Sequence, residues 1–236
     1  MDNNRQHLGL FITATDTGVG KTAVGAVLIR HLTAWGKIVR PRKPVESGCQ
    51  RLVTGLLPAD AARLQQAAGR RESLERICPW PLEAPISPER AGCLAGFNLT
   101  LKDLTAACHA GVEQGDFLLV EGAGGFLSPL APKVRNAELA VALGLPLVLV
   151  IADRLGCINH VLLTVEAIVA RGLRLAAVVL NRRGATPIPG MDNAADLSTW
   201  LGIKIYCLPE ISGGDQDVEH QLQFLLEPEF LLKITE

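Results

Sequence analysis

A strand, a glycine-containing loop and a helix are predicted in succession near the start of the chain. Leu8–Ala14 is aliphatic enough for a buried strand, and Thr22–Trp35 has helical composition and is stopped by Gly36. The backbone N–H groups of such a loop and the helix N-terminus bind phosphate oxygens, Lys21 adds a positive charge, and the Thr22 hydroxyl can coordinate Mg²⁺. The segment therefore predicts a nucleotide-binding loop, although Thr15 stands where the usual pattern begins with glycine.

Short apolar runs alternate with amphipathic stretches through the rest of the chain. Further strands are predicted at 37–40, 117–120, 146–152, 175–180 and 203–208, and further helices at 60–68, 103–114 and 158–171. Strands without polar alternation need cover on both faces, which indicates a parallel sheet between helices. We therefore expect an α/β fold with a single doubly wound, mainly parallel sheet, in one domain over residues 1–236. Cys78–Pro88 and Arg182–Pro189 are expected to be surface loops.

The composition excludes several classes of partner. The formal net charge is −1 and aromatic residues make up 4% of the chain, so neither nucleic acid nor an anionic membrane is an expected partner. The polar N-terminus lacks the apolar stretch of a signal peptide, and the longest apolar run is broken by Gly144 and Pro146. Six widely spaced cysteines indicate reduced thiols. We expect a cytoplasmic protein that acts on a small molecule.

Two carboxylates are candidates for metal binding. Glu121 ends the strand at 117–120 and precedes Gly122, where close backbone approach suits a magnesium–phosphate site. Its alternative is an ordinary glutamate at a sheet end. Asp60 on its own is explained equally well as a helix cap.

Lys43 follows the second predicted strand. If that strand neighbours the first, Lys43 lies near the phosphate loop, where a second cation can stabilise the charge that develops during phosphoryl transfer. From spacing alone, a solvated surface lysine explains the residue equally well.

Seven short motifs follow one another along the chain: ATDTGVGKT at 14–22, KPVESG at 43–48, PADAARL at 58–64, APISP at 84–88, VEGAGG at 120–125, LGCINHVLLT at 155–164 and VLN at 179–181. In this order they resemble the dethiobiotin synthetase family, whose members close the ureido ring in biotin biosynthesis with ATP. The motifs extend over most of the chain to about residue 210. The resemblance implies a P-loop NTPase-like fold with ATP as co-substrate and Mg²⁺ as cofactor.

The resemblance also implies roles for individual residues. Nucleotide binding falls to Gly18, Val19, Gly20, Lys21, Thr22, Ala23, Gly122, Ala123 and Gly124, with Asn181, Arg182, Pro209, Glu210 and Ile211 around the base. Thr22, Asp60 and Glu121 hold the metal, and Lys43 is the catalytic lysine. The substrate contacts are Thr17, Ser47, Cys157 and Asn159, the last two at a helix start that receives the substrate carboxylate from the partner subunit of a homodimer. Asn159 is alternatively a simple helix cap.

The sequence departs from the family pattern in three places. Ala14 stands where the family commonly has glycine, and Gly18 stands where some members have an acidic residue, so the contact of that carboxylate is not carried over. The pair Arg182-Arg183 also differs, which leaves the base preference open.

The substrates implied are 7,8-diaminononanoate and carbon dioxide, and three other functions compete with this one. A ParA/MinD-like switch ATPase usually has an extra lysine early in the loop, where this chain has Asp16. A cobyrinate-type amidating synthetase needs a glutamine amidotransferase domain, for which 236 residues are expected to be too few. The third alternative is a non-catalytic regulatory domain of the same fold, and it holds only if the candidate metal-binding carboxylates have no function.

Overall fold

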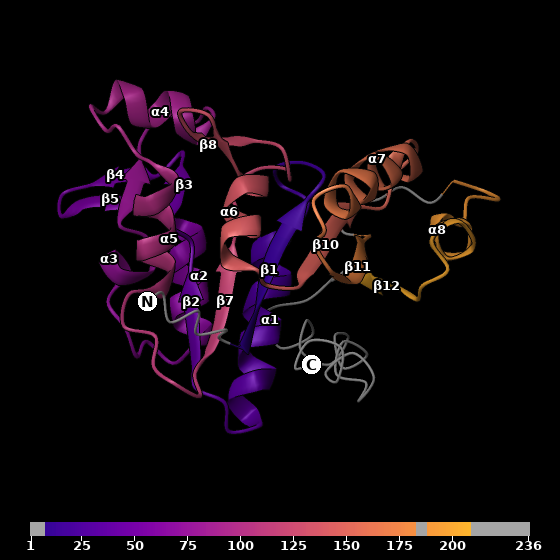
Figure 1. Cartoon of the computed structure of the whole chain (residues 1–236), viewed down its shortest axis with the longest axis horizontal. Coiled ribbons are helices and arrows are strands. Elements are labelled where there is room, and N and C mark those ends of the chain that lie inside the picture. The colour runs from indigo at the N-terminus through magenta and orange to yellow at the C-terminus, as the bar shows by residue number, and fades with distance from the viewer. Residues whose placement is uncertain (1–7, 183–187, 209–236) are drawn as a thin grey trace.

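A computed structural model describes residues 8–182 and 188–208 of the chain, and six parallel strands form its central sheet (Figure 1). In spatial order the strands are β12 (Ile205–Leu208), β11 (Leu175–Asn181), β10 (Leu147–Ala152), β1 (Leu8–Ala14), β7 (Phe117–Glu121) and β2 (Val39–Arg42). The chain passes from β7 on one side of β1 to β10 on the other. Because ligands bind at the carboxyl ends of strands at such a switch point, the loop after β1 lies where a ligand is expected.

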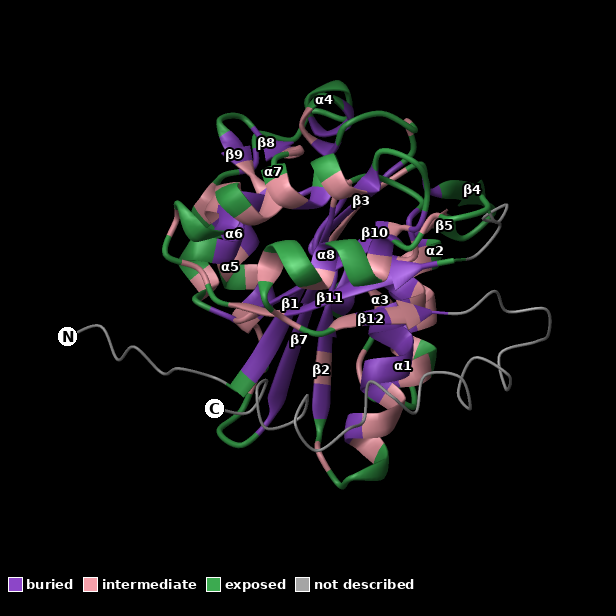
Figure 2. Cartoon of the chain, turned by 90° about the vertical axis from the view of Figure 1, so that its right-hand side faces the viewer, coloured by how far each residue is buried: buried purple, intermediate pink, exposed green. Residues whose placement is uncertain are grey.

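Helices cover both faces of the sheet. One face packs against α1 (Lys21–Ala34) and α2 (Ala59–Ala67), and the other against α5 (Leu101–His109), α6 (Asn136–Leu143), α7 (Cys157–Val169) and α8 (Asn193–Leu201). Helix α4 (Pro88–Leu94) packs instead against short strands outside the central sheet. Alternation along β1 separates the two cores, since Leu10 and Ile12 pack with α1 while Phe11 packs with α5 and α6. Figure 2 shows buried strands between helices whose outer faces are exposed. Within the described ranges, no helix has the length and apolar character to cross a bilayer.

Small sheets lie at one edge of the fold, with the short α3 (Leu74–Ile77) nearby. The pairs are β3 (Val45–Ser47) with β6 (Trp80–Leu82), β4 (Gln50–Leu52) with β5 (Gly55–Leu57), and β8 (Pro129–Ala131) with β9 (Val134–Arg135). The prediction of a surface loop over Cys78–Pro88 is correct only for residues 83–87, which form a largely exposed loop. It is wrong for the first half, because β6 pairs with β3 and both Cys78 and Leu82 are buried. Pro81 is tolerated because β6 lies at the edge of its two-stranded sheet.

The doubly wound parallel α/β fold is confirmed, while several boundaries move. The second strand lies at Val39–Arg42 rather than 37–40, and it neighbours β7 instead of β1. Helix α5 begins at Leu101, behind a capping box of Thr100 and Asp103, and ends before Gly111, whose φ is +70°. Helices α6 and α8 were not predicted.

The cysteines are unpaired in the structure. All six lie in the described residues and none forms a disulfide. Burial raises the pKa of the Cys108 thiol to about 12, so this side chain packs as a small apolar group.

Candidate active site

The loop after β1 is held in shape by a side chain from a distant strand. Gly20 caps the start of α1 in a left-handed conformation with φ 104°, and a Cβ there would collide with Asn181 Nδ2. Asn181, at the end of β11, donates from the same nitrogen to the Val19 carbonyl at 2.9 Å. Thr17 and Gly18 are exposed at the mouth of the loop. The exposed part of the loop is therefore accessible to a ligand from solvent, as phosphate binding to its backbone requires.

Lys21 is buried beneath this loop. Its Nζ donates to the Asp16 carbonyl at 3.0 Å. Burial lowers the pKa of Lys21 to about 8; Glu121 opposes this effect and the nearby charge of Lys43 adds to it. An ammonium group with so little solvation is suited to an anionic ligand such as a phosphate.

Lys43 lies between the two candidate metal carboxylates. Its Nζ is 2.5 Å from Glu121 Oε1 and 2.7 Å from Asp60 Oδ2. Burial alone would lower the pKa of Lys43, but the charges of Glu121, Asp60 and Glu46 outweigh it and raise that pKa. Lys43 is therefore an ammonium ion, and a solvated surface position is excluded because only 3% of its surface is exposed.

The expected magnesium ligands meet in one place. Thr22 Oγ1 donates to Glu121 Oε1 at 2.8 Å. Burial would raise the pKa of Asp60, but its contacts with Lys43 and Thr22 lower it, so this group is also ionised. Glu121 Oε2 is buried and has no hydrogen-bond partner among the described residues, which fits an oxygen that completes a metal site.

The donor set suits Mg²⁺ rather than a softer metal. In the described part of the chain, no group of three or more His, Cys, Asp or Glu residues is placed to hold a metal ion. Two carboxylates and a hydroxyl suffice for Mg²⁺, which takes its remaining oxygens from phosphates and water.

The glycine loop after β7 is held against the nucleotide loop. Gly122 N–H donates to the Ile12 carbonyl at 3.0 Å and Phe126 N–H to the Ala14 carbonyl at 2.8 Å. A Cβ at Gly125 would lie 2.9 Å from the Thr15 carbonyl oxygen, so only glycine permits this approach. The two loops thus form one wall of the site.

Asn136, which sequence reasoning missed, supports the glycine loop from below. It is fully buried at the start of α6, and its Nδ2 donates to the carbonyls of Ala123 and Gly125 at 2.8 Å each. Its Oδ1 accepts from the Ala123 N–H at 3.1 Å. A buried amide that satisfies three loop groups fixes the loop's conformation. The only signal in the sequence is an asparagine eleven residues after Gly125, the last glycine of the motif, and such a residue is too common to single out.

The expected base-binding residues are only partly described. Arg182 Nε donates to Asp153 Oδ2 at 2.9 Å, and Asn193 Nδ2 donates to the other oxygen of Asp153 at 2.7 Å. Sequence reasoning singled out neither Asp153 nor Asn193. Pro209, Glu210 and Ile211 lie outside the described residues.

Two of the expected substrate contacts, Cys157 and Asn159, lie in the first turn of α7. Cys157 is buried and Asn159 is exposed there, and no side chain caps the helix start at Gly156. No hydrogen bond or ion pair joins Cys157 or Asn159 to Lys21 or Lys43 in the described structure.

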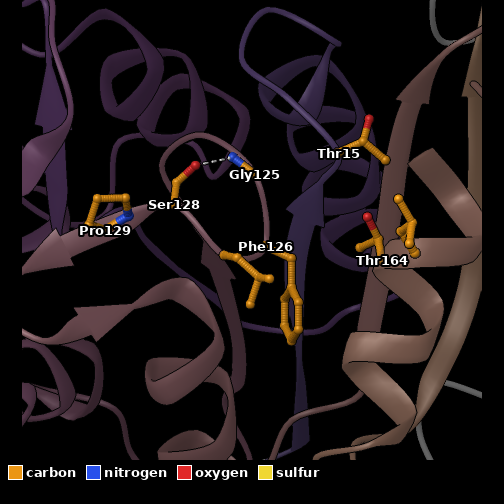
Figure 3. Close-up of a pocket in the computed structure, with 8 residues that line it drawn as sticks. Thr15, Gly125, Phe126, Ser128, Pro129 and Thr164 are labelled. Carbon is orange, nitrogen blue, oxygen red and sulfur yellow. Dashed lines mark hydrogen bonds between the residues drawn. The ribbon is translucent and has the colours of Figure 1, made fainter. Parts of the chain in front are cut away.

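A pocket of about 430 Å³ lies beside the glycine loop. Figure 3 shows Ser128, bonded to the Gly125 N–H at 2.9 Å, on one side of it and Thr15 and Thr164 on the other. Its lining includes neither Cys157 nor Asn159. The pocket adjoins the nucleotide loop through Thr15 and is open to a small ligand.

Comparisons with known proteins identify the family of the chain. A family model described as an AAA domain matches residues 8–212. The ATP-dependent dethiobiotin synthetase of Anaeromyxobacter dehalogenans (strain 2CP-1) is 44% identical over 191 residues, with 80% of this chain and 84% of that protein covered. The corresponding protein of Ralstonia nicotianae is 43% identical, with 81% and 83% covered. The chain belongs to the dethiobiotin synthetase family.

Solved structures support the fold of this dethiobiotin synthetase family member. The MinC:MinD cell division complex of Aquifex aeolicus matches with a TM-score of 0.53 at 15% identity, covering 96% of this chain and 92% of that one. A ParA family ATPase from Chlorobium tepidum matches with 0.51 at 13% identity, covering 97% and 96%. At such low identity these matches show a shared nucleotide-binding fold and say nothing of a shared function.

Proposed function

We propose that the protein is an ATP-dependent dethiobiotin synthetase that carboxylates 7,8-diaminononanoate with carbon dioxide and closes the ureido ring. The observation that carries the proposal is the buried cluster of Lys21, Lys43 and Glu121 at the carboxyl ends of the central strands. The relatives are ATP-dependent dethiobiotin synthetases, which is the basis for the proposed reaction. The two lysines of the cluster provide the positive charges that a phosphoryl transfer to an anion needs.

The proposed reaction has three bond-forming steps. One amine of the substrate and carbon dioxide form a carbamate with loss of a proton. A carbamate oxygen attacks the γ-phosphorus of ATP, the bond to the bridging oxygen breaks, and ADP leaves. The second amine then attacks the carbonyl carbon of the carbamic–phosphoric anhydride, and phosphate and a proton depart as the ring closes. No covalent intermediate on the protein is needed.

The chain's own residues bring two anions together. We assign Lys21 to the nucleotide phosphates and Lys43 to the carbamate and the γ-phosphate, where their charges would offset the repulsion between the reactants; the burial of Lys21 and the ion pair of Lys43 support this assignment. Thr17, exposed on the loop, and Ser47, half-buried at the end of β3, are the proposed hydrogen-bonding contacts of the substrate. Mg²⁺, held by Thr22, Asp60 and Glu121, would neutralise charge on the phosphate oxygens.

The nucleotide base is proposed to lie beyond the end of β11. Asn181 and Arg182 are placed there, with Pro209, Glu210 and Ile211 outside the described residues. Asp153 accepts hydrogen bonds from both Arg182 and Asn193, and these bonds hold the guanidinium group of Arg182 in place beside the proposed base site.

We further propose a homodimer in which the first turn of α7 from one subunit binds the carboxylate of the substrate held by the other. The support is a helix start with no side-chain cap, next to Leu155, which is 81% exposed. Mixing a Lys43→Gln protein with an Asn159→Asp protein should restore activity, because each mixed dimer has one complete site. Persistent inactivity of the mixture, or a monomer by light scattering, would contradict the dimer.

The decisive assay uses the purified protein with ATP, Mg²⁺, bicarbonate and the diamine. We expect dethiobiotin, identified by mass spectrometry, and one ADP for each ring formed. ATP hydrolysis that proceeds without the diamine and gives no ring would contradict the proposal and favour a partner-controlled switch ATPase.

A further inference from the structure

Glu46 is a buried carboxylate next to the site that no part of the proposed reaction uses. It lies in the middle of β3 with 7% of its surface exposed. Its Oε1 accepts from the Asp60 N–H and its Oε2 from the Ala61 N–H, each at 3.0 Å. Both acceptors of one side chain therefore bind the first turn of α2.

Helix α2 has no cap of its own. Its N-cap residue is Pro58, whose side chain offers no acceptor, so the first-turn N–H groups need a partner from elsewhere. Glu46 is that partner, and its negative charge also suits the positive end of the helix dipole. A proline at the N-cap makes the first turn of α2 depend on a different segment of the chain.

The segment that supplies Glu46 also supplies Lys43, and it is well anchored. Lys43 N–H donates to the Ile77 carbonyl at 2.9 Å, and Trp80 N–H donates to the Pro44 carbonyl at 3.3 Å. Glu46 itself is paired in register with Pro81 of β6. The backbone that carries Lys43 and Glu46 is thus fixed as one unit.

Asp60 is therefore tied to this segment twice. Its backbone N–H binds Glu46 and its side chain binds Lys43 Nζ at 2.7 Å. The Glu46 contact is the one that does not involve a catalytic group, so it can set the position of Asp60 when Lys43 engages the reactants.

We infer that Glu46 is a positioning residue that holds Asp60 at the metal site by binding the first turn of α2. The inference rests on the proposed function, since Asp60 is a metal ligand only within it. A residue that merely capped the helix would affect stability alone, whereas a positioning residue also affects metal affinity.

The test separates these two roles with a local cap. Glu46→Ala removes both acceptors, and Glu46→Gln keeps the shape but sets an amide nitrogen against one N–H donor. Pro58→Ser, combined with Glu46→Ala, gives α2 an N-cap hydroxyl without restoring the link to β3. Glu83→Gln, which breaks only an exposed pair with Arg51 of 2.7 Å, is the matched control.

The primary readout is Mn²⁺ binding to the ADP-bound protein by electron paramagnetic resonance, alongside thermal unfolding. We expect Mn²⁺ affinity to fall by about 10- to 100-fold in Glu46→Ala and Glu46→Gln, as is typical when the support of a metal ligand is lost. In the double variant, thermal stability should recover while Mn²⁺ affinity stays low. Metal-free ADP binding and the control variant should match the wild type.

Several outcomes would overturn the inference. Unchanged Mn²⁺ affinity in both single variants would do so, as would recovery of affinity together with stability in the double variant. Should Glu46→Ala fail to fold, Glu46→Gln with and without Pro58→Ser carries the same comparison. The measurement needs no diamine, so absence of dethiobiotin in the assay above would refute the function without deciding this result. A wild-type protein that binds no Mn²⁺ would refute the inference itself.

Discussion

Lys43 and Glu121 form a buried ion pair, with Nζ 2.5 Å from Oε1, although they are 78 residues apart in the chain. Lys43 follows β2 and Glu121 ends β7, and these parallel strands are neighbours in the sheet. Removing one partner of a buried pair leaves an uncompensated charge, at a cost of about 3–5 kcal/mol. The same contact therefore contributes to stability and holds the proposed catalytic cation in place.

Lys43→Gln should reduce turnover while leaving ATP binding nearly intact. The amide keeps a polar contact to Glu121 but lacks the charge that offsets repulsion between carbamate and γ-phosphate, so kcat should fall at least about tenfold, or 1.4 kcal/mol. Steady-state kinetics and calorimetric ATP binding measure the two effects separately. Lys102→Gln, at an exposed position of α5, is the control. Near-normal turnover of Lys43→Gln would contradict the role of Lys43.

Asp60→Ala should weaken the response to Mg²⁺. Its carboxylate lies beside Lys43 and Thr22, and under the proposed function it is a ligand of Mg²⁺ that the substitution removes. A tenfold rise in the Mg²⁺ concentration for half-maximal activity would correspond to about 1.4 kcal/mol. The experiment is an Mg²⁺ titration of activity at saturating ATP, and an unchanged titration would make Asp60 an ordinary residue of the first helical turn.

Local signals predicted β1, α1 and the loop between them. The aliphatic run Leu8–Ala14 matches β1 residue for residue, because a strand buried on both faces has no polar alternation to obscure it. The second strand was placed two residues early, because Lys37 and Ile38 share its composition but lie in the connection between α1 and β2. Boundaries depend on the ends of pairing with other strands, which a single segment does not show.

Contacts between distant segments account for what sequence reasoning missed. Lys43 was expected near the phosphate loop through a neighbouring β1, yet it reaches the site through Glu121 on the intervening β7. Asn136 and Glu46 have no chemistry in their own neighbourhood of the sequence, because each binds backbone groups of another segment. Only the family resemblance gave Asp60 a role beyond that of a helix cap.

Asn136→Ala should destabilise the protein and lower activity together. Truncation leaves the carbonyls of Ala123 and Gly125 and the Ala123 N–H without their buried partner, and each unsatisfied group costs about 1–3 kcal/mol. Urea unfolding should show a loss of at least about 2 kcal/mol, and kcat should fall because the glycine loop shapes the site. Asn98→Ala, at an exposed position, should stay within about 0.5 kcal/mol of wild type. Equal stability of the two variants would contradict the assigned support.

The stability of the protein should decline in acid partly through Glu138 on α6. Hydrogen bonds from Arg135 lower the pKa of Glu138 from 4.5 to about 2, with Nη2 2.6 Å from Oε1. Because the folded-state pKa is below the unfolded one, this contribution is present above about pH 4.5 and is lost as the pH falls towards 2. Glu138 also accepts from the Arg135 N–H at 2.8 Å, at the start of the helix that carries Asn136.

We therefore expect Glu138→Gln to lower the unfolding free energy at pH 6 and to flatten its decline below pH 4.5, measured by urea unfolding across that range. The control is Glu166→Gln, on the exposed side of α7, whose unfolding free energy should follow that of the wild type at every pH. If the unfolding free energy of Glu138→Gln instead declines in parallel with the wild type below pH 4.5, the Arg135–Glu138 contact contributes nothing to acid stability.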